Sequence, residues 1–292
     1  MHMAPWRSQR GSPHFCNTLL MDWVRLPAVA GRFYPADESS LRGMVEGLLQ
    51  EVPEAAPKAT APKALIAPHA GYVYSGPVAA SIYARLLPFR DRYQRVVLLG
   101  PAHRYPFRGL AASSAVAFQT PMGRIPLDTA AMAHALELPL VRLMDQAHEG
   151  EHSLEVHLPF LQAVLGEFQL VPLVVGDALP EEVEGVLDEL WGGEETLVVV
   201  STDLSHFLPH GQAVTMDEAT ASAIEAFRPE EIAPEQACGR IPMGGLLLRA
   251  RALALQVERV DLRTSGDTAG PRDQVVGYGS FLFTPPVDTT AR

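Results

Sequence analysis

Short apolar runs alternate with stretches of helical period along most of the chain. The apolar runs are ALIAP, RVVLLGP, LVPLVVGD and TLVVVS, and the helical stretches include PVAASIYARLL and EEVEGVLDEL. Runs of about five apolar residues that lack apolar–polar alternation are typical of strands that are covered on both faces. The pattern therefore predicts an α/β protein with a mostly parallel central sheet and helices on both of its faces.

Three other segments complete the predicted architecture. Residues 109–127 (GLAASSAVAFQTPMGRIPL) contain strand and turn signals without a helix, which predicts a hairpin or an added antiparallel β layer at one edge. Residues 275–283 (VVGYGSFLF) predict a last strand, and residues 51–63 (EVPEAAPKATAPK) a surface connection. No repeat with a period of twenty to fifty residues is visible, which argues against a solenoid.

The length and the N-terminal composition limit the domain count. A chain of 292 residues with 47% hydrophobic content fits one large domain about as well as two smaller ones. The first twenty residues lack the apolar region and the cleavage site of a signal peptide, and Met21 is an alternative start. We expect a disordered or misassigned leader over residues 1–20 and a single α/β domain over residues 21–292.

Charge and cysteine content narrow the possible partners. The formal net charge is −11 and no cluster of Lys and Arg is present, which disfavours nucleic acid and anionic membranes as partners. No apolar run approaches the eighteen or so residues of a membrane-spanning helix. The two cysteines, Cys16 and Cys238, are too few for a disulfide framework, so we expect a cytoplasmic protein.

Histidines follow several of the predicted strands. His69 comes after ALIAP, His103 after RVVLLGP, and Asp203 and His206 after TLVVVS. Ligands of open α/β sheets bind outside the carboxyl ends of the strands. A single histidine of this kind is more often a core residue that bonds to a carbonyl oxygen. Several together favour a functional pocket, and His69 and His103 are the best candidates to hold a metal ion there.

The segment HEGEHSLEVHLPFL adds further histidines and carboxylates. His152, Glu155 and His157 stand at a spacing that cannot place all three on one face of a helix. We expect His152 to precede a helix and point at the pocket, Glu155 to form a capping box, and His157 to be solvated or packed. For His148 and Glu149, an exposed loop is the simplest expectation.

Cys238 precedes a run of helical character over residues 241–253. Two interpretations stay open for it. It is a buried, inert thiol, or it is a thiolate ligand whose pKa is lowered at the N-terminus of a helix.

Six motifs occur in the order of a known family. They are PAVAGRFYP, APHAGYVYSG, LLGPAH, EHSLEVHLPFL, STDLSH and ACGRIPMGG. Between about Leu26 and Phe283 the chain resembles the MEMO family, whose fold is similar to that of the class III extradiol (LigB-type) dioxygenases. Six ordered motifs are far more specific than any one of them.

This resemblance implies a set of site residues. His69, His103 and Cys238 match the metal ligands of the family, and Asp203 and His206 line the same pocket. The related dioxygenases hold Fe(II) with two histidines and a carboxylate. By this resemblance we expect Fe(II). Here Cys238 replaces the carboxylate, and because a thiolate shifts the metal preference toward Cu or Zn, these two metals are the alternatives.

Our first functional hypothesis is a metal-dependent oxidoreductase of the dioxygenase type that acts on a small aromatic substrate. His206 is the expected acid–base residue. Asp203 either orients its imidazole or caps a helix. Tyr74 and His152 are expected to contact the substrate. Whether the protein turns over a substrate at all stays open at this point.

Rival hypotheses use the same pocket differently. One is a non-enzymatic scaffold that binds a metal or a peptide segment and acts with AMMECR1-like and radical SAM proteins, which accompany prokaryotic members of the family. A zinc hydrolase ranks lower, although two histidines, a thiolate and an open position suit metal-activated water. The chain has no G-x-S-x-G elbow.

Overall fold

The computed structural model describes residues 23–53 and 60–286, so the predicted leader and Cys16 lie outside the described residues. A mixed sheet of nine strands forms its centre, in the order β10-β12-β2-β9-β3-β8-β4-β7, with β11 paired to β12. Its strands are β2 (Ala64–Ala67), β3 (Arg95–Pro101), β4 (Leu110–Ala112), β7 (Val141–Leu143), β8 (Gln169–Val175), β9 (Thr196–Ser201), β10 (His206–Leu208), β11 (Gln256–Thr264) and β12 (Val275–Thr284).

The middle of the sheet is parallel and its margins are mixed. Strands β2, β9, β3 and β8 run in one direction, with Ile66 opposite Val200 and Leu98 opposite Pro172. Strand β12 joins β2 in the antiparallel direction, and β4 joins β8 likewise. The predicted α/β architecture is confirmed, and the last strand lies where the sequence predicted it.

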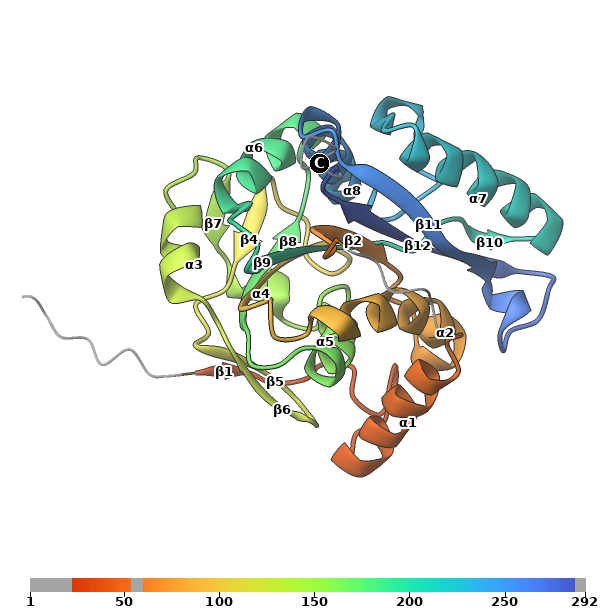
Figure 1. Cartoon of the computed structure of the whole chain (residues 1–292), viewed down its shortest axis with the longest axis horizontal. Helices are drawn as coiled ribbons and strands as arrows, with labels where there is room; N and C mark the ends of the chain where they lie inside the picture. The colour runs from red at the N-terminus through yellow and green to blue at the C-terminus, as the bar shows by residue number, and fades with distance from the viewer. Residues whose placement is uncertain (1–22, 54–59, 287–292) are drawn as a thin grey trace, which may run out of the picture.

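Helices cover both faces of the sheet (Figure 1). Successive strand residues alternate between the two cores: Leu65 and Val199 pack on one side, Ile66 and Val198 on the other. The first side holds α1 (Glu38–Gln50), α2 (Tyr72–Tyr83) and α5 (Leu158–Val164); the second holds α3 (Thr129–Ala135), α6 (Pro180–Leu190), α7 (His210–Glu225) and α8 (Arg240–Ala252). Burial on both faces explains why β2, β3, β8 and β9 are apolar at their interior positions.

A second sheet of three strands lies beside the first core (Figure 1). It contains β1 (Val24–Arg25), β5 (Ala117–Thr120) and β6 (Gly123–Pro126). Strands β5 and β6 form the antiparallel hairpin that residues 109–127 predicted. The sequence did not indicate β1, which pairs with β5 in the parallel direction. The short helices are α4 (Asp145–His148) and the 3₁₀ turns η1 (Ala84–Phe89), η2 (Glu155–His157), η3 (Pro229–Glu231) and η4 (Ser265–Asp267).

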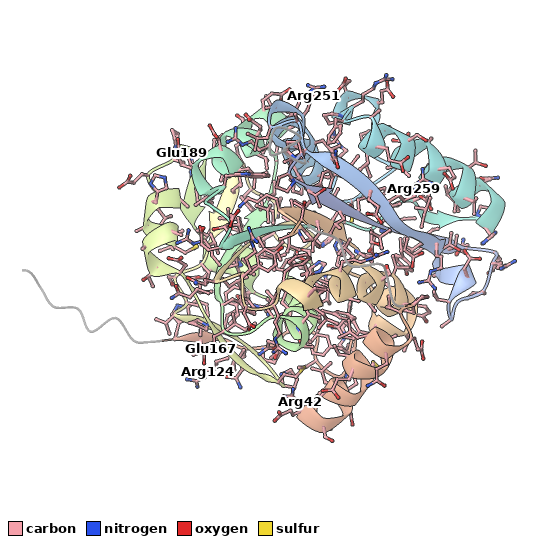
Figure 2. All side chains as sticks on the ribbon, viewed as in Figure 1. Arg42, Arg124, Glu167, Glu189, Arg251 and Arg259 are labelled. Carbon is pink, nitrogen blue, oxygen red and sulfur yellow. The ribbon has the colours of Figure 1, made fainter. Side chains whose placement is uncertain are left out.

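Figure 2 shows charged side chains such as Arg42, Arg251 and Arg259 at the periphery of the molecule. Lys63 is an exception, since it is buried and its Nζ donates to three backbone carbonyl oxygens of residues 191–196 at 2.6–2.7 Å. The predicted surface connection over residues 51–63 is therefore wrong at its C-terminal end, and residues 54–59 lie outside the described part. Within residues 23–53 and 60–286, no helix is long and apolar enough to cross a membrane.

Candidate metal centre

The carboxyl ends of three adjacent strands form the site. Strand β9 lies between β2 and β3, so the residues that follow these strands meet at one edge of the sheet. His69 follows β2 and is 2% exposed, while the side chain of His103, after β3, is 27% exposed. Asp203 follows β9 and is buried. The prediction that these strand ends converge is confirmed.

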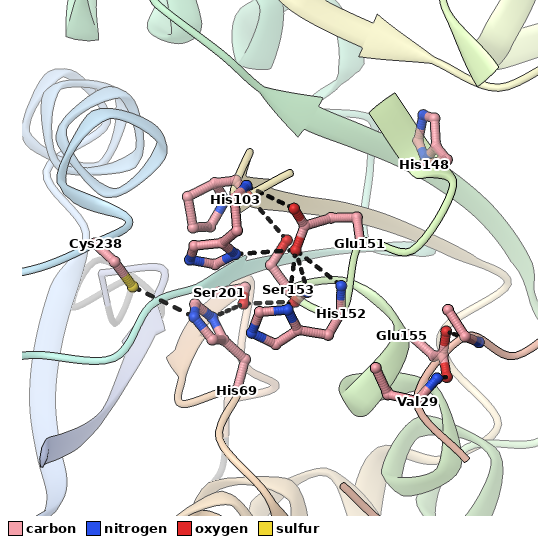
Figure 3. A network of polar contacts seen from close by, with 12 residues as sticks. Val29, His69, His103, His148, Glu151, His152, Ser153, Glu155, Ser201 and Cys238 are labelled. Carbon is pink, nitrogen blue, oxygen red and sulfur yellow. Dashed lines mark hydrogen bonds and ion pairs between the residues drawn. The ribbon is translucent and has the colours of Figure 1, made fainter. Parts of the chain in front are cut away.

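Three imidazoles come together there (Figure 3). His69, His103 and His152 each offer a ring nitrogen, and these three atoms lie within 4.8 Å of one another. The ring centroids of His69 are 5.1 Å from His103 and 5.4 Å from His152, and those of His103 and His152 are 4.6 Å apart. Among the residues that the structure describes, this is the one group of candidate ligands with such spacing.

The hydrogen bonds of His69 fix its tautomer. The hydroxyl of Ser201 donates its single proton to the carbonyl oxygen of Ser153 at 2.6 Å. Ser201 Oγ, 2.6 Å from Nδ1 of His69, must therefore accept a proton from that nitrogen. Burial, together with the neighbouring histidines, holds the pKa of His69 well below its usual value, so the ring is neutral. Its Nε2 therefore carries the lone pair, faces the Cys238 thiol at 3.3 Å and is the nitrogen available to a metal ion.

Glu151 orients the ring of His103 through a contact at Nδ1. Its Oε1 lies 2.9 Å from Nδ1 of His103, and its Oε2 accepts the backbone N–H of His103 at 2.6 Å. Burial opposes ionisation of Glu151, but the hydrogen bonds and charge of His103, with the N–H of Ser153, lower its pKa to about 2. An ionised carboxylate only accepts, so Nδ1 of His103 carries a proton and Nε2 is the ring nitrogen that is left to face a metal ion.

His152 completes the cluster with an uncommitted nitrogen. Its Nδ1 is buried and has no hydrogen-bond partner among the described residues, although Glu151 Oε1 is 3.4 Å away. Burial lowers the pKa of His152 to about 4, so this ring is also neutral at pH 7. Imidazole nitrogens are good ligands for transition metals, so the three closely spaced rings fit a metal ion. The expectation that His152 precedes a helix and points at the pocket is confirmed.

Cys238 approaches His69 from the side away from His152 (Figure 3). Its Sγ lies 3.3 Å from Nε2 of His69, yet it does not belong to the group of three nitrogens. Burial, then the charge of Asp203, raises the pKa of this thiol to about 12, so the lowered pKa considered from its place before α8 is wrong. Its role as a metal ligand stays a prediction.

A glycine brings the Cys238 segment this close to the sheet. A Cβ on Gly239 would lie 2.4 Å from the carbonyl oxygen of Ser201 and 2.7 Å from Cβ of Thr202. Only glycine permits that approach of the α8 N-terminus to the end of β9.

Asp203 contacts His69 rather than a helix. Its Oδ1 accepts the backbone N–H of His69 at 2.7 Å, and its Oδ2 is 4.0 Å from Nε2 of the same residue. Burial raises the pKa of Asp203 to about 7. The alternative of a helix N-cap is wrong, because β10 follows Asp203 and α7 begins only after Pro209.

His206 and Tyr74 do not belong to the group of three histidines. Burial lowers the pKa of the partly buried His206, and the electrostatic effect of His103 lowers this pKa further. Tyr74 lies in the first turn of α2 and is 41% exposed. The catalytic roles of His206 and Asp203, and substrate binding by Tyr74 and His152, stay predictions.

A buried ion pair behind the cluster was not visible in the sequence. The guanidinium of Arg25 pairs with Glu155 and also donates to the carbonyl oxygens of His148 and Glu151, at 3.1 and 2.6 Å for Nη2. Arg25 therefore holds both ends of the loop that carries Glu151. Glu155 accepts in addition from Tyr34 and from the N–H groups of residues 28 and 29, so the predicted capping box is wrong.

Two further histidines are structural. His148 was expected in an exposed loop, but it is 1% exposed and its Nε2 lies 3.0 Å from the carbonyl oxygen of Ala111, whereas Glu149 is exposed as expected. His157 is packed in the core, with Nδ1 2.8 Å from the hydroxyl of Tyr83.

Comparisons with known proteins agree with the six motifs. The family model described as Memo-like protein matches residues 25–282. The chain belongs to this Memo-like family. A MEMO1 family protein of Aquifex aeolicus is 36% identical over 271 residues, covering 89% of this chain and 99% of the relative. A MEMO1 family protein of Methanopyrus kandleri is 36% identical over 286 residues, covering 89% of this chain and 98% of the relative.

A solved structure shares the fold of this Memo-like protein at low identity. It is the crystal structure of an uncharacterised protein of Escherichia coli K12, with a TM-score of 0.50 and 15% identity, covering 74% of this chain and 98% of the other. At this identity the likeness concerns the fold alone. The predicted similarity to class III extradiol dioxygenases stays a prediction.

Proposed function

We propose that this Memo-like protein holds one transition-metal ion at His69, His103 and His152 and acts there as an oxidoreductase. The observation that carries the proposal is the convergence of three imidazoles whose nitrogens lie within 4.8 Å of one another. Two of these rings are oriented by partners at Nδ1, Ser201 and Glu151. Such oriented imidazoles are typical of metal sites.

The donor set restricts the metal. Imidazole nitrogens suit Fe, Cu and Zn, whereas Mg and Ca prefer oxygen ligands. We propose Fe(II) for the redox-active form, with Cu or Zn as alternatives. The thiol of Cys238 stands beside His69 as a further donor, and loss of its proton on metal binding would favour the softer metals.

We propose a small aromatic substrate and a reaction of the extradiol type. The bound metal would supply the redox chemistry and the attachment point for substrate and oxygen. His206, whose pKa lies below its usual value, is neutral at pH 7 and able to accept a proton from a substrate hydroxyl. Asp203, with a pKa of about 7, is a second group able to hold or release a proton beside His69.

Anaerobic reconstitution with Fe(II), followed by addition of catechols and measurement of oxygen uptake, tests this function. We expect uptake by the parent protein and its loss in His206→Ala. The matched control is His134→Ala, since the His134 side chain is 46% exposed and pairs with Glu189 away from the cluster. Equal uptake by the parent and the His206→Ala variant would remove the proposed acid–base role.

A scaffold is the second candidate. Phe207, directly after His206, is 68% exposed and has a φ of 58°, so the backbone holds an apolar ring outward at a strained position. Tyr74 is exposed as well. We propose that a peptide segment, including one from AMMECR1-like or radical SAM proteins, is the alternative occupant. Retention of a partner by Phe207→Ser in a pull-down would argue against it.

A further inference from the structure

A separate cavity lies next to the three-histidine cluster. It has a volume of about 550 Å³ and lies between the ends of β3 and β8 and the start of α8. Cys238 and Ala102 form the part of its wall that faces the metal centre. Cys238 Sγ is 3.3 Å from His69 Nε2, and Ala102 directly precedes His103. The side chain of Cys238 therefore lies between a molecule in this cavity and the proposed metal ion.

The walls of the cavity are mainly apolar. Pro101, Phe107, Val175, Ile241 and Pro242 line it together with Ala102. Burial of apolar ligand surface against such walls is favourable. A volume of this size lies within the range of about 300–1,000 Å³ that holds small organic ligands. The cavity thus offers contact area for a ring rather than hydrogen bonds.

The charged groups at the cavity do not offer an anion site. Arg108 donates through Nη1 to the carbonyl oxygen of Asp177 at 2.7 Å and through Nη2 to Glu182 at 2.5 Å. Two of its five N–H donors are therefore committed to protein acceptors, and Glu182 balances its charge. Asp177 itself is exposed at the margin and adds negative charge. A carboxylate or phosphate in the cavity would meet a guanidinium that is already paired with Glu182, together with the negative charge of Asp177.

We propose that this cavity binds the uncharged, apolar portion of the substrate, with the reacting end directed past Cys238 toward the histidines. The ligand class is a small neutral aromatic compound rather than an aromatic acid or a phosphate ester. This inference rests on the proposed function only for the statement that the ligand is a substrate. Binding itself requires no turnover.

The test uses N-phenyl-1-naphthylamine, a neutral dye that fluoresces in apolar surroundings. We expect saturable binding to the full-length protein and at least a tenfold weaker affinity in Ala102→Phe, which fills the cavity. A second variant, Ile241→Glu, places a charge in the apolar wall and is expected to weaken binding as much. Its matched control, Leu143→Glu, changes a residue of β7 that is 53% exposed and should leave binding unchanged.

Competition identifies the ligand class. Benzamide and benzoate have similar shapes, and we expect benzamide to displace the dye at a concentration at least tenfold lower than benzoate. Preferential displacement of the dye by benzoate would overturn the proposal. Unchanged dye binding in both Ala102→Phe and Ile241→Glu would also overturn it, provided that both variants unfold like the parent and are therefore folded. Adjacency to the metal is read from quenching of the bound dye by Co(II), which we expect to disappear in His69→Ala. Dye binding without oxygen uptake would support the cavity and reject only the proposed oxidation.

Discussion

Sγ of Cys238 lies 3.3 Å from Nε2 of His69, the nitrogen whose lone pair the hydrogen bond to Ser201 leaves free. In the metal-free protein this thiol is protonated, because burial and Asp203 raise its pKa to about 12. A metal ion at His69 would supply the positive charge that removes the proton. The same contact thus suits an inert thiol, and it would also suit a thiolate ligand once a metal ion is bound.

Co(II) absorption distinguishes these states. We expect the parent complex to show a thiolate-to-metal charge-transfer band that Cys238→Ser lacks, while Cys238→Ser still binds Co(II) through three imidazoles. His152→Ala should bind more weakly, because it removes the third nitrogen. A parent spectrum without the band would exclude Cys238 as a ligand, and full affinity in His152→Ala would exclude His152.

Ser201→Ala tests the orientation of His69. We expect the affinity for Zn(II), measured by competition with a chelator, to fall about 10- to 100-fold, as is typical for loss of a partner behind a metal ligand. The reason is that Nδ1 of His69 loses its acceptor at 2.6 Å and the ring no longer has a fixed tautomer. Ser81→Ala is the control, since the Ser81 hydroxyl contacts Val78 and Ser280. Equal affinities of the two variants would contradict this role.

Arg25→Met tests the buried ion pair behind the Glu151 loop. Both side chains are at most 5% exposed, so removal of the guanidinium leaves Glu155 buried without its counter-ion. We expect the free energy of unfolding, measured by urea denaturation, to fall by about 3–5 kcal/mol. Arg42→Met breaks an exposed pair with Glu38 on α1 and should cost about 0.5 kcal/mol or less. A similar small loss in both variants would show that the buried pair adds no stability.

Asp217→Asn tests a buried carboxyl on α7. Oδ1 of Asp217 accepts the N–H of Ser205 at 3.0 Å, but its Oδ2 is buried without a hydrogen-bond partner among the described residues. Burial raises its pKa to about 6 from 3.8. Between pH 3.8 and 6 this carboxyl is ionised in the unfolded chain but still protonated in the folded protein. The free energy of unfolding therefore falls through this range, by the full amount above pH 6 and not at all below pH 3.8.

We therefore expect Asp217→Asn to stabilise the protein by about 1–3 kcal/mol at pH 7.5 and to have no such effect at pH 4. The measurement is thermal unfolding at both pH values. Asp91→Asn, at a side chain that is 92% exposed, is the control and should change little at either pH. A stabilisation of Asp217→Asn that is equal at pH 4 and 7.5 would contradict the electrostatic cause.

Local periodicity was enough to predict the sheet and the edge at which the site lies. The runs that became β2, β3 and β9 are apolar at their interior positions because helices bury both of their faces. His69 and His103 stand directly beyond two of these runs, and the carboxyl ends of parallel strands share one edge. A residue pattern of this kind is local in the sequence and therefore visible in it.

Only the tertiary structure decided how the site residues are paired. Glu155 looked like a capping residue, but it lies 130 positions from Arg25, its partner in the fold. His103 and Glu151 are 48 positions apart, and His69 and Ser201 are 132 apart. The thiol of Cys238 precedes a helix, a position that lowers a pKa, yet burial outweighs that effect. Desolvation and contacts across the chain depend on packing, which no local period encodes.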